Sequence, residues 1–179
     1  DGDVSPDLLI GTAGETLLLV RSRKERGWEE VEAIPAFAAS HVTVGRLDDD
    51  PHPDLVLTRF STARAAGGEQ AGIGKDARDA VVVLWGRPPR PGTGRFAREL
   101  STRIPVTAAV ATAVGDLNGD RHTDLIVAVH QGQGTFNGFS RGWLGDGRRG
   151  LVPLAKGFAT SGTTDVAVAH VNTGGRKAS

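Results

Sequence analysis

Residues 116–127 read Asp-Leu-Asn-Gly-Asp-Arg-His-Thr-Asp-Leu-Ile-Val, an acidic loop that closes on Asp-Leu and runs into β-branched residues. Related copies of this pattern, without gaps, occupy residues 1–10 and 48–57. A sequence that recurs at long intervals is typical of a repeat architecture. The chain is therefore predicted to consist of similar units in series, each carrying one acidic loop.

Oxygen-bearing side chains alternate along the best-preserved loop. Positions one, three, five and nine are Asp116, Asn118, Asp120 and Asp124, and His122 at position seven would offer its backbone carbonyl. Ca²⁺ takes six to eight oxygen ligands in flexible geometry, and this alternation suits a loop that wraps the ion. The same residue types are also common in ordinary turns between strands. Because each copy is followed by a strand-like run, we favour a calcium loop that belongs to the repeated unit.

The other two loops are less complete. The first copy begins after its expected first ligand, and the second has Arg46 where an acid is expected. A guanidinium at Arg46 could pair with the nearby carboxylates in place of a metal. The oxygen-bearing candidates are Asp1, Asp3, Ser5 and Asp7 in the first, truncated loop and Asp48, Asp50 and Asp54 in the second, degenerate loop.

Short apolar segments around the loops predict β strands, and no segment shows a convincing helical period. One strand precedes each loop, one follows it, and two more follow after a turn or a longer connection. The expected strands are 8–10, 16–20 and 28–34, then 41–47, 54–58, 80–86 and 96–100, then 108–114, 124–129, 142–145 and 151–154, and finally 164–172.

Units of four short strands in series predict an all-β chain, a β-propeller or a propeller arc of about three blades. The expected blades are 1–37, 38–104 and 105–160, with a further blade starting at 161–179, all within one repeat domain over 1–179. Closed propellers typically have four to eight blades, and unpaired strand edges recruit partners. We therefore expect a protein partner or further copies of the chain to complete the propeller.

The loop at residues 115–128 resembles that of FG-GAP/VCBS repeats, the calcium-binding blades of integrin-α-like and bacterial surface propellers. Residues 83–86 and 143–147 are similar to the strand and turn that those repeats carry further on. The resemblance implies bound Ca²⁺ and a location outside the cytoplasm: extracellular, on the cell surface or periplasmic. The family usually has glycine at the sixth loop position, where this chain has Val4, Pro51 and Arg121.

Composition narrows the class of function. The 21 Lys and Arg residues balance 21 Asp and Glu residues, so there is no basic excess that would favour nucleic acid, and there is no membrane-spanning apolar run. No nucleophile, acid and base cluster stands out, which favours a protein that is not an enzyme. We expect a recognition or assembly module in a larger protein or complex. The alternatives are a carbohydrate-binding lectin propeller and an accessory subunit that supports a catalytic or electron-transfer neighbour.

Overall fold

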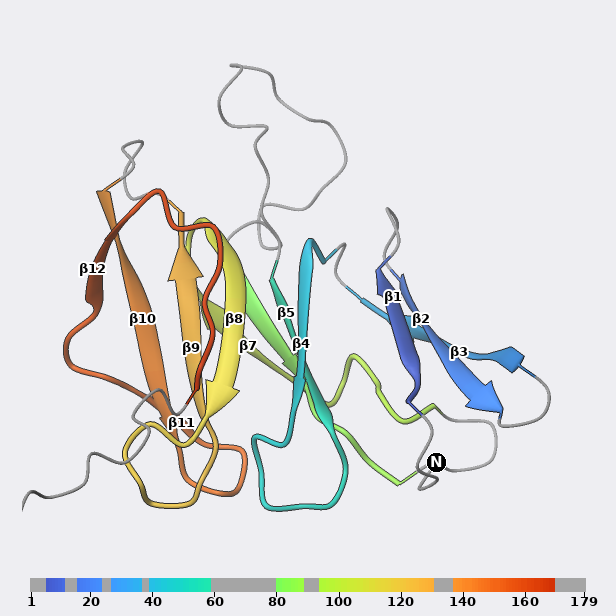
Figure 1. The fold of residues 1–179 in the computed structure, drawn as a ribbon. Coiled ribbons are helices and arrows are strands. Elements are labelled where there is room, and N and C mark those ends of the chain that lie inside the picture. The colour runs from blue at the N-terminus through green and yellow to red at the C-terminus, as the bar shows by residue number, and fades with distance from the viewer. Residues whose placement is uncertain are drawn as a thin grey trace, which may run out of the picture.

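The computed structural model describes residues 6–11, 16–23, 27–36, 39–58, 80–88, 94–130 and 137–169. Within these ranges the chain is all-β, as predicted, and forms three antiparallel sheets without any helix (Figure 1). The described part of the chain accordingly holds no helix that could cross a membrane.

The three sheets follow one another along the chain, and each is built from consecutive antiparallel strands. The first consists of β1 (Leu8–Gly11), β2 (Thr16–Arg23) and β3 (Gly27–Pro35). The second consists of β4 (His41–Gly45), β5 (Asp54–Thr58), β6 (Ala80–Leu84) and β7 (Ser101–Pro105). The third consists of β8 (Ala109–Gly115), β9 (Asp124–Val129), β10 (Asn137–Gly145) and β11 (Leu151–Pro153), with β12 (Phe158–Ser161) also paired to β10.

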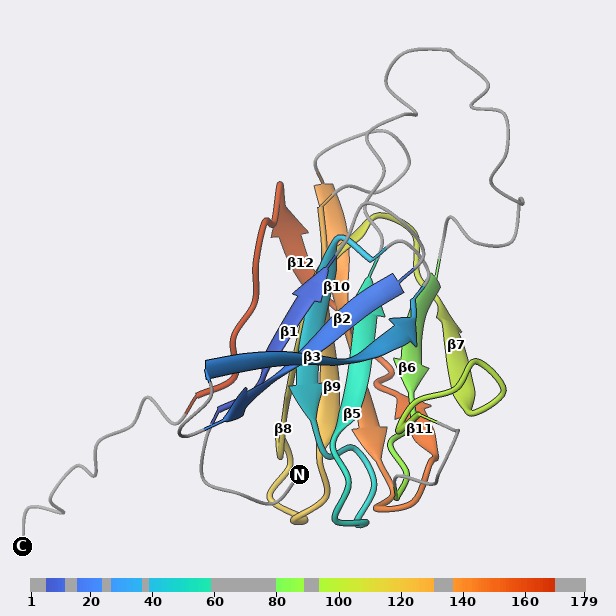
Figure 2. The same cartoon turned by 90° about the vertical axis from the view of Figure 1, so that its right-hand side faces the viewer.

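The second sheet lies between the other two, and an apolar core fills each junction (Figures 1 and 2). Alternation along β5 explains how one strand serves both cores, because successive side chains point to opposite faces of a sheet. Leu55 and Leu57 pack toward the first sheet, whereas Val56 packs toward the third. All five residues of β5 are buried, as expected for a strand covered on both faces.

The first strands of neighbouring units meet through valine and glycine. The side chain of Val114 on β8 fills the space beside Gly45 on β4, where a Cβ atom would collide with it. Val168 fills the equivalent space beside Gly115 at the end of β8. Thr43 on β4 also donates a hydrogen bond from its Oγ1 to the carbonyl of Thr112, at 2.7 Å. The valine–glycine contact therefore occurs twice, between β4 and β8 and between β8 and the segment that contains Val168.

The prediction of a fourth strand over residues 96–100 in the second unit is wrong. The strand at that position is β7, at residues 101–105, and the preceding residues form a turn closed by the Leu100 N–H donating to the Ala97 carbonyl at 3.0 Å. Phe96 is buried in the core between the first two sheets. The apolar residues of this segment thus anchor a turn rather than alternate along a strand.

The third unit also differs from its prediction. β10 begins at Asn137 rather than at the expected 142, and β12 has no counterpart among the expected strands. Residues 164–169 of the expected strand 164–172 are not in a strand. They run past β8 instead, with the Thr163 carbonyl 2.9 Å from His130 Nδ1 and Val168 against Gly115. The connection over 61–79 lies outside the described residues.

Candidate functional site

Three connections meet at one end of the sheets and form what we call the loop edge. These are residues 46–54 between β4 and β5, residues 116–124 between β8 and β9, and residues 146–150 between β10 and β11 (Figure 1). The Asp49 N–H donates to the Gly147 carbonyl at 2.8 Å, and His122 Nδ1 lies 3.4 Å from the Asp49 carboxylate. Two of the predicted metal loops are therefore in contact with each other.

The aspartate at the ninth loop position is a structural acceptor in both loops. Asp54 accepts hydrogen bonds from the N–H groups of Leu47 and Gly86, each at 2.8 Å. Asp124 accepts equivalent bonds from Leu117 at 2.7 Å and Gly145 at 2.9 Å. Both aspartates are 0% exposed. Each carboxylate thus ties the start of its loop to the end of the third strand of its sheet.

Burial has an electrostatic cost for Asp54. Desolvation raises the pKa of its carboxyl, while the hydrogen bonds from Gly86 and Leu47 act in the opposite direction. The nearby Asp48 carboxylate also raises it. Asp54 is therefore held in its place by backbone donors although the site disfavours its charge.

Glycine is required where these bonds are made. A Cβ atom on Gly86 would collide with the Pro53 carbonyl oxygen, and one on Gly145 would collide with the Thr123 carbonyl oxygen. Close approach of two backbones is a common reason for glycine in a strand or at its end. Sequence reasoning missed this role, although the recurrence of glycine one or two residues after a tryptophan was its signal.

In the loop 116–124 the predicted ligands bond to the loop itself. Asp116 accepts from the N–H groups of Gly119 at 2.6 Å and Arg121 at 2.9 Å, and Asn118 accepts from the Asp120 N–H at 3.0 Å. Asp120 accepts from the His122 N–H at 2.8 Å and from the Asn118 side chain, and these bonds lower the pKa of the Asp120 carboxyl. Arg121, at the sixth position, has a φ of 75° and so adopts the conformation that the family glycine permits.

The oxygen ligands of this loop suit Ca²⁺, but in this structure they do not surround a common ion position. Carboxylate, amide and carbonyl oxygens are the ligands that Ca²⁺ prefers. Among the described residues, however, no group of three or more His, Cys, Asp or Glu side chains is placed to share a metal ion. Asp116, Asn118 and Asp120 are exposed, and Asp124 is occupied by its two backbone donors.

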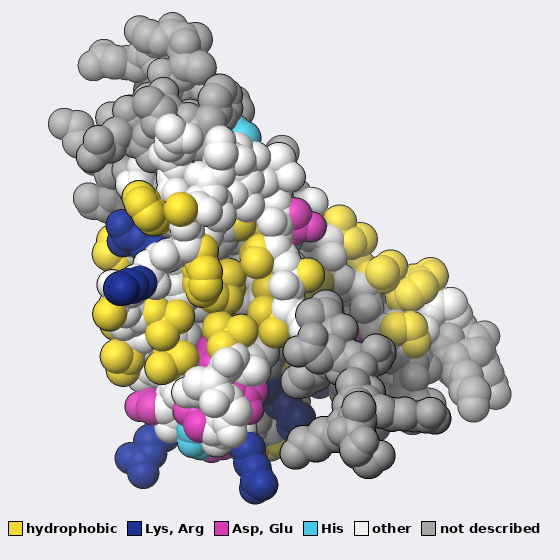
Figure 3. Space-filling view, turned by 60° about the vertical axis from the view of Figure 1, so that its left-hand side comes forward, with side chains coloured by type: hydrophobic (Ala, Val, Ile, Leu, Met, Phe, Trp, Pro, Cys, Tyr) yellow, Lys and Arg dark blue, Asp and Glu magenta, His cyan; other side chains and the backbone are white. Residues whose placement is uncertain are grey.

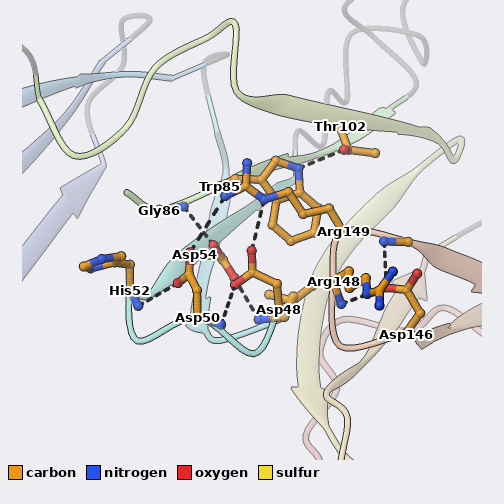
Figure 4. Close-up of polar contacts among 12 residues, drawn as sticks. Asp48, Asp50, His52, Asp54, Trp85, Gly86, Thr102, Asp146, Arg148 and Arg149 are labelled. Carbon is orange, nitrogen blue, oxygen red and sulfur yellow. Dashed lines mark hydrogen bonds and ion pairs between the residues drawn. The ribbon is translucent and has the colours of Figure 1, made fainter. Parts of the chain in front are cut away.

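In the loop 46–54 a cation is already present, and it is not the one expected from sequence. Arg149, from the loop 146–150, places Nε 3.0 Å from Asp48 Oδ2 and Nη2 3.8 Å from Asp50 Oδ2 (Figure 4). Arg46 makes no ion pair with these carboxylates in the described part of the chain. The expected replacement of a metal by a guanidinium thus has its counterpart in Arg149, and the assignment to Arg46 is wrong.

The first loop is only partly visible. Asp1, Asp3 and Ser5 lie outside the described residues. Asp7, at the ninth position, accepts a hydrogen bond from the Ser22 N–H at 3.3 Å. Since Ser22 is on β2, this aspartate also bonds to the third strand of its predicted unit, as Asp124 bonds to Gly145 at the end of β10 and Asp54 bonds to Gly86 just beyond β6.

Comparison with known proteins agrees with the repeat. Neither a search of curated proteins nor a search of solved structures gave a match to this chain. A family model, the FG-GAP repeat, matches residues 108–143, which include β8, the loop 116–124, β9 and most of β10. The resemblance seen in the loop sequence is therefore confirmed, and residues 108–143 carry an FG-GAP repeat.

Proposed function

We propose that this chain is a non-enzymatic β-propeller module for protein recognition or assembly, within a larger extracytoplasmic protein or complex. The FG-GAP repeat supports this proposal, because such repeats are typically interaction modules of extracellular or surface proteins. The observation that carries it is the contrast between β5 and β6 of the second sheet, which are almost fully buried, and the first and third sheets, which expose groups of large apolar side chains.

Large apolar side chains are exposed at both ends of the arrangement. Each of the six is at least 44% exposed, and monomeric proteins rarely leave such side chains grouped at the surface without a binding role. Figure 3 shows apolar side chains gathered over the third sheet. The six exposed apolar side chains are Leu8, Ile10 and Trp28 on the first sheet and Phe139, Val152 and Phe158 on the third.

We infer that the chain from about residue 161 begins a further blade. Val168 occupies beside Gly115 the position that Val114 occupies beside Gly45. Val114 belongs to the first strand of its sheet, so by this equivalence residues 163–169 follow the path of the next first strand. We propose that further strands pair with residues 163–169 and cover the exposed apolar side chains of the third sheet.

Light scattering tests the recognition proposal. We expect the purified chain to self-associate, and we expect Trp28→Glu and Phe158→Glu to reduce the association without lowering the melting temperature. Leu117→Glu, at an exposed residue on the loop edge, serves as the matched control. A monodisperse wild-type monomer with cooperative unfolding would contradict the proposal.

The loop 116–124 is the proposed Ca²⁺ site, supported by its alternating oxygen donors and by the exposure of three of them. Binding would require the carboxylates of Asp116 and Asp120 to turn from backbone donors toward the ion. Because a ligand that binds only the folded state stabilises it by about 2.7 kcal/mol at 100 times Kd, Ca²⁺ should raise the melting temperature. Asp120→Ala should abolish this rise and Asp165→Ala should preserve it; no response of the wild type to Ca²⁺ would refute the site.

A lectin function has less support. Stacking of a sugar needs an exposed aromatic face, but the two tryptophans next to the loop edge are buried, with Trp85 3% and Trp143 7% exposed. Both of these tryptophans pack in the core between the second and third sheets. They therefore serve the interior of the fold. The exposed rings, Trp28, Phe139 and Phe158, lie among the apolar side chains that we assign to protein contacts.

A further inference from the structure

Arg149 connects two sheets through charge and through an aromatic ring. Its guanidinium pairs with Asp48 and Asp50 of the second sheet's loop and lies 5.5 Å from the centroid of the Trp85 ring. Trp85 directly follows β6 and is fixed by its Nε1–H, which donates to Thr102 Oγ1 at 2.9 Å. A cation over a tryptophan ring adds attraction to the ion pairs. Figure 4 shows these contacts from a single side chain of the third sheet.

The loop 46–54 needs such a cation. Asp48 is only 7% exposed, and a buried carboxylate without a partner is strongly unfavourable. Three more carboxylates, Asp49, Asp50 and Asp54, lie in the same loop. Burial raises the pKa of the Asp54 carboxyl, and the charge of Asp48 raises it further. Among the described residues, Arg149 is the one cationic side chain in an ion pair with Asp48 or Asp50.

The turn that carries Arg149 is held in shape independently. Asp146 Oδ1 accepts hydrogen bonds from the N–H groups of Arg148 and Gly150, both at 2.9 Å. These bonds hold the pKa of the Asp146 carboxyl below its usual range. Gly147 provides a φ of 71° in the same turn, and its carbonyl accepts from Asp49. The guanidinium is thus delivered by a fixed turn and not by a freely moving side chain alone.

We propose that Arg149 is the resident cation of the loop 46–54. The guanidinium occupies the role that a metal ion would have among Asp48 and Asp50, and it fastens the second sheet to the third. This junction is therefore independent of Ca²⁺, and the loop 46–54 does not bind Ca²⁺ while Arg149 is in place. The proposal does not depend on whether the loop 116–124 binds Ca²⁺.

A double-mutant cycle in chelator tests the pair. Asp48→Asn keeps an oxygen that can accept the Asp50 N–H, which now donates to Asp48 Oδ1 at 3.2 Å. We expect Arg149→Gln and Asp48→Asn each to lower the melting temperature by about 3 to 5 °C. The double variant should lose about as much as the less stable single variant, and not the sum of the two losses. Arg148→Gln, on the adjacent exposed residue, should change it by about 1 °C or less. Additive losses, or an equal loss in Arg148→Gln, would overturn the proposal.

A calcium titration tests the second consequence. The titration uses the Asp120→Ala variant, so that the loop 116–124 does not contribute. With Arg149 present, Ca²⁺ should leave the melting temperature of this variant unchanged. A calcium-dependent rise that disappears on adding Asp50→Asn would show that the loop 46–54 binds the ion beside Arg149, and would overturn the proposal. A wild type that fails to respond to Ca²⁺ would refute the site at 116–124 and leave the Arg149 cycle intact.

Discussion

The loops 46–54 and 116–124 share one framework but differ in how their charge is balanced. Asp54 and Asp124 make the same pair of backbone hydrogen bonds, to the residue seven positions earlier and to a glycine at or just beyond the end of the third strand. The remaining acidic side chains diverge. In both loops the side chains at positions three and five accept hydrogen bonds from their own backbone. Those of 46–54 are in addition compensated by a guanidinium from the next sheet, whereas those of 116–124 are exposed.

The acidic residues of these loops therefore have two separate roles, one in holding the fold together and one in charge balance or ion binding. The aspartate at the ninth position has a structural role, because its carboxylate joins the loop to the end of the third strand in both loops. Positions one to five are free to balance their charge in different ways. An acidic loop in such a repeat therefore indicates a blade-like unit of strands, whether or not the loop binds a metal ion.

Replacement of the buried aspartates tests the shared framework and should have the largest effect. Asp54→Asn and Asp124→Asn each put an amide NH₂ against a backbone N–H donor in a buried site. A buried donor without an acceptor costs about 1 to 3 kcal/mol, so we expect each variant to lose about 2 to 3 kcal/mol of unfolding free energy. Urea unfolding followed by tryptophan fluorescence measures the loss, with exposed Glu99→Ala as the control. A loss in only one loop would show that the frameworks are not equivalent.

Replacement of the paired glycines tests the same framework from the other side. Alanine at Gly86 or Gly145 would drive its Cβ into a backbone carbonyl, and overpacking of this kind costs typically 1 to 3 kcal/mol. We expect about 2 kcal/mol at both positions, measured by the same urea unfolding. Gly11→Ala is the control, since its Cβ would make only an ordinary contact with Leu17 at 3.8 Å. Equal stability of the Gly145→Ala variant and the wild type would argue against the close approach.

Much of the fold could be predicted from the sequence, because its signal is local. β5 and β9 have their predicted bounds: each directly follows an acidic loop and consists largely of β-branched and leucine residues. The segment at 96–100 has a similar apolar content, yet Phe96 is an anchor of a turn. Periodicity over five residues cannot distinguish these two uses of an apolar side chain.

The candidate site was less predictable, because its contacts are distant in sequence. Arg149 and Asp48 are 101 positions apart, whereas Arg46 stands two residues from Asp48 and is the nearest cation in the sequence. Proximity along the chain favoured the wrong arginine. The correct one depends on the second and third sheets lying side by side, which is a property of the packed cores and not of the loop.

The sixth loop position offers a test in which the two loops should respond with opposite signs. Arg121 has a φ of 75°, a conformation that costs a non-glycine residue about 1 to 2 kcal/mol, so Arg121→Gly should raise the stability by about 0.5 to 1 kcal/mol. Pro51 cannot adopt that conformation, and Pro51→Gly should lower the stability by about as much, because the unfolded chain gains freedom. Chemical denaturation of both variants in chelator checks the signs. Stabilisation by Pro51→Gly would mean that its loop also prefers the left-handed conformation.

The smallest expected effect is a pH dependence carried by Asp54. Burial raises the pKa of its carboxyl in the folded state above the usual value, so the folded state holds this proton more tightly than the unfolded state does. The resulting stabilisation is present below the unfolded pKa and is lost as the pH rises through the folded pKa. The stability of the wild type relative to Asp54→Asn should therefore decline as the pH rises from about 4. Urea unfolding of both proteins across this range measures the difference, and a difference that grows with pH would mean that the hydrogen bonds from Leu47 and Gly86 outweigh the desolvation of the Asp54 carboxylate.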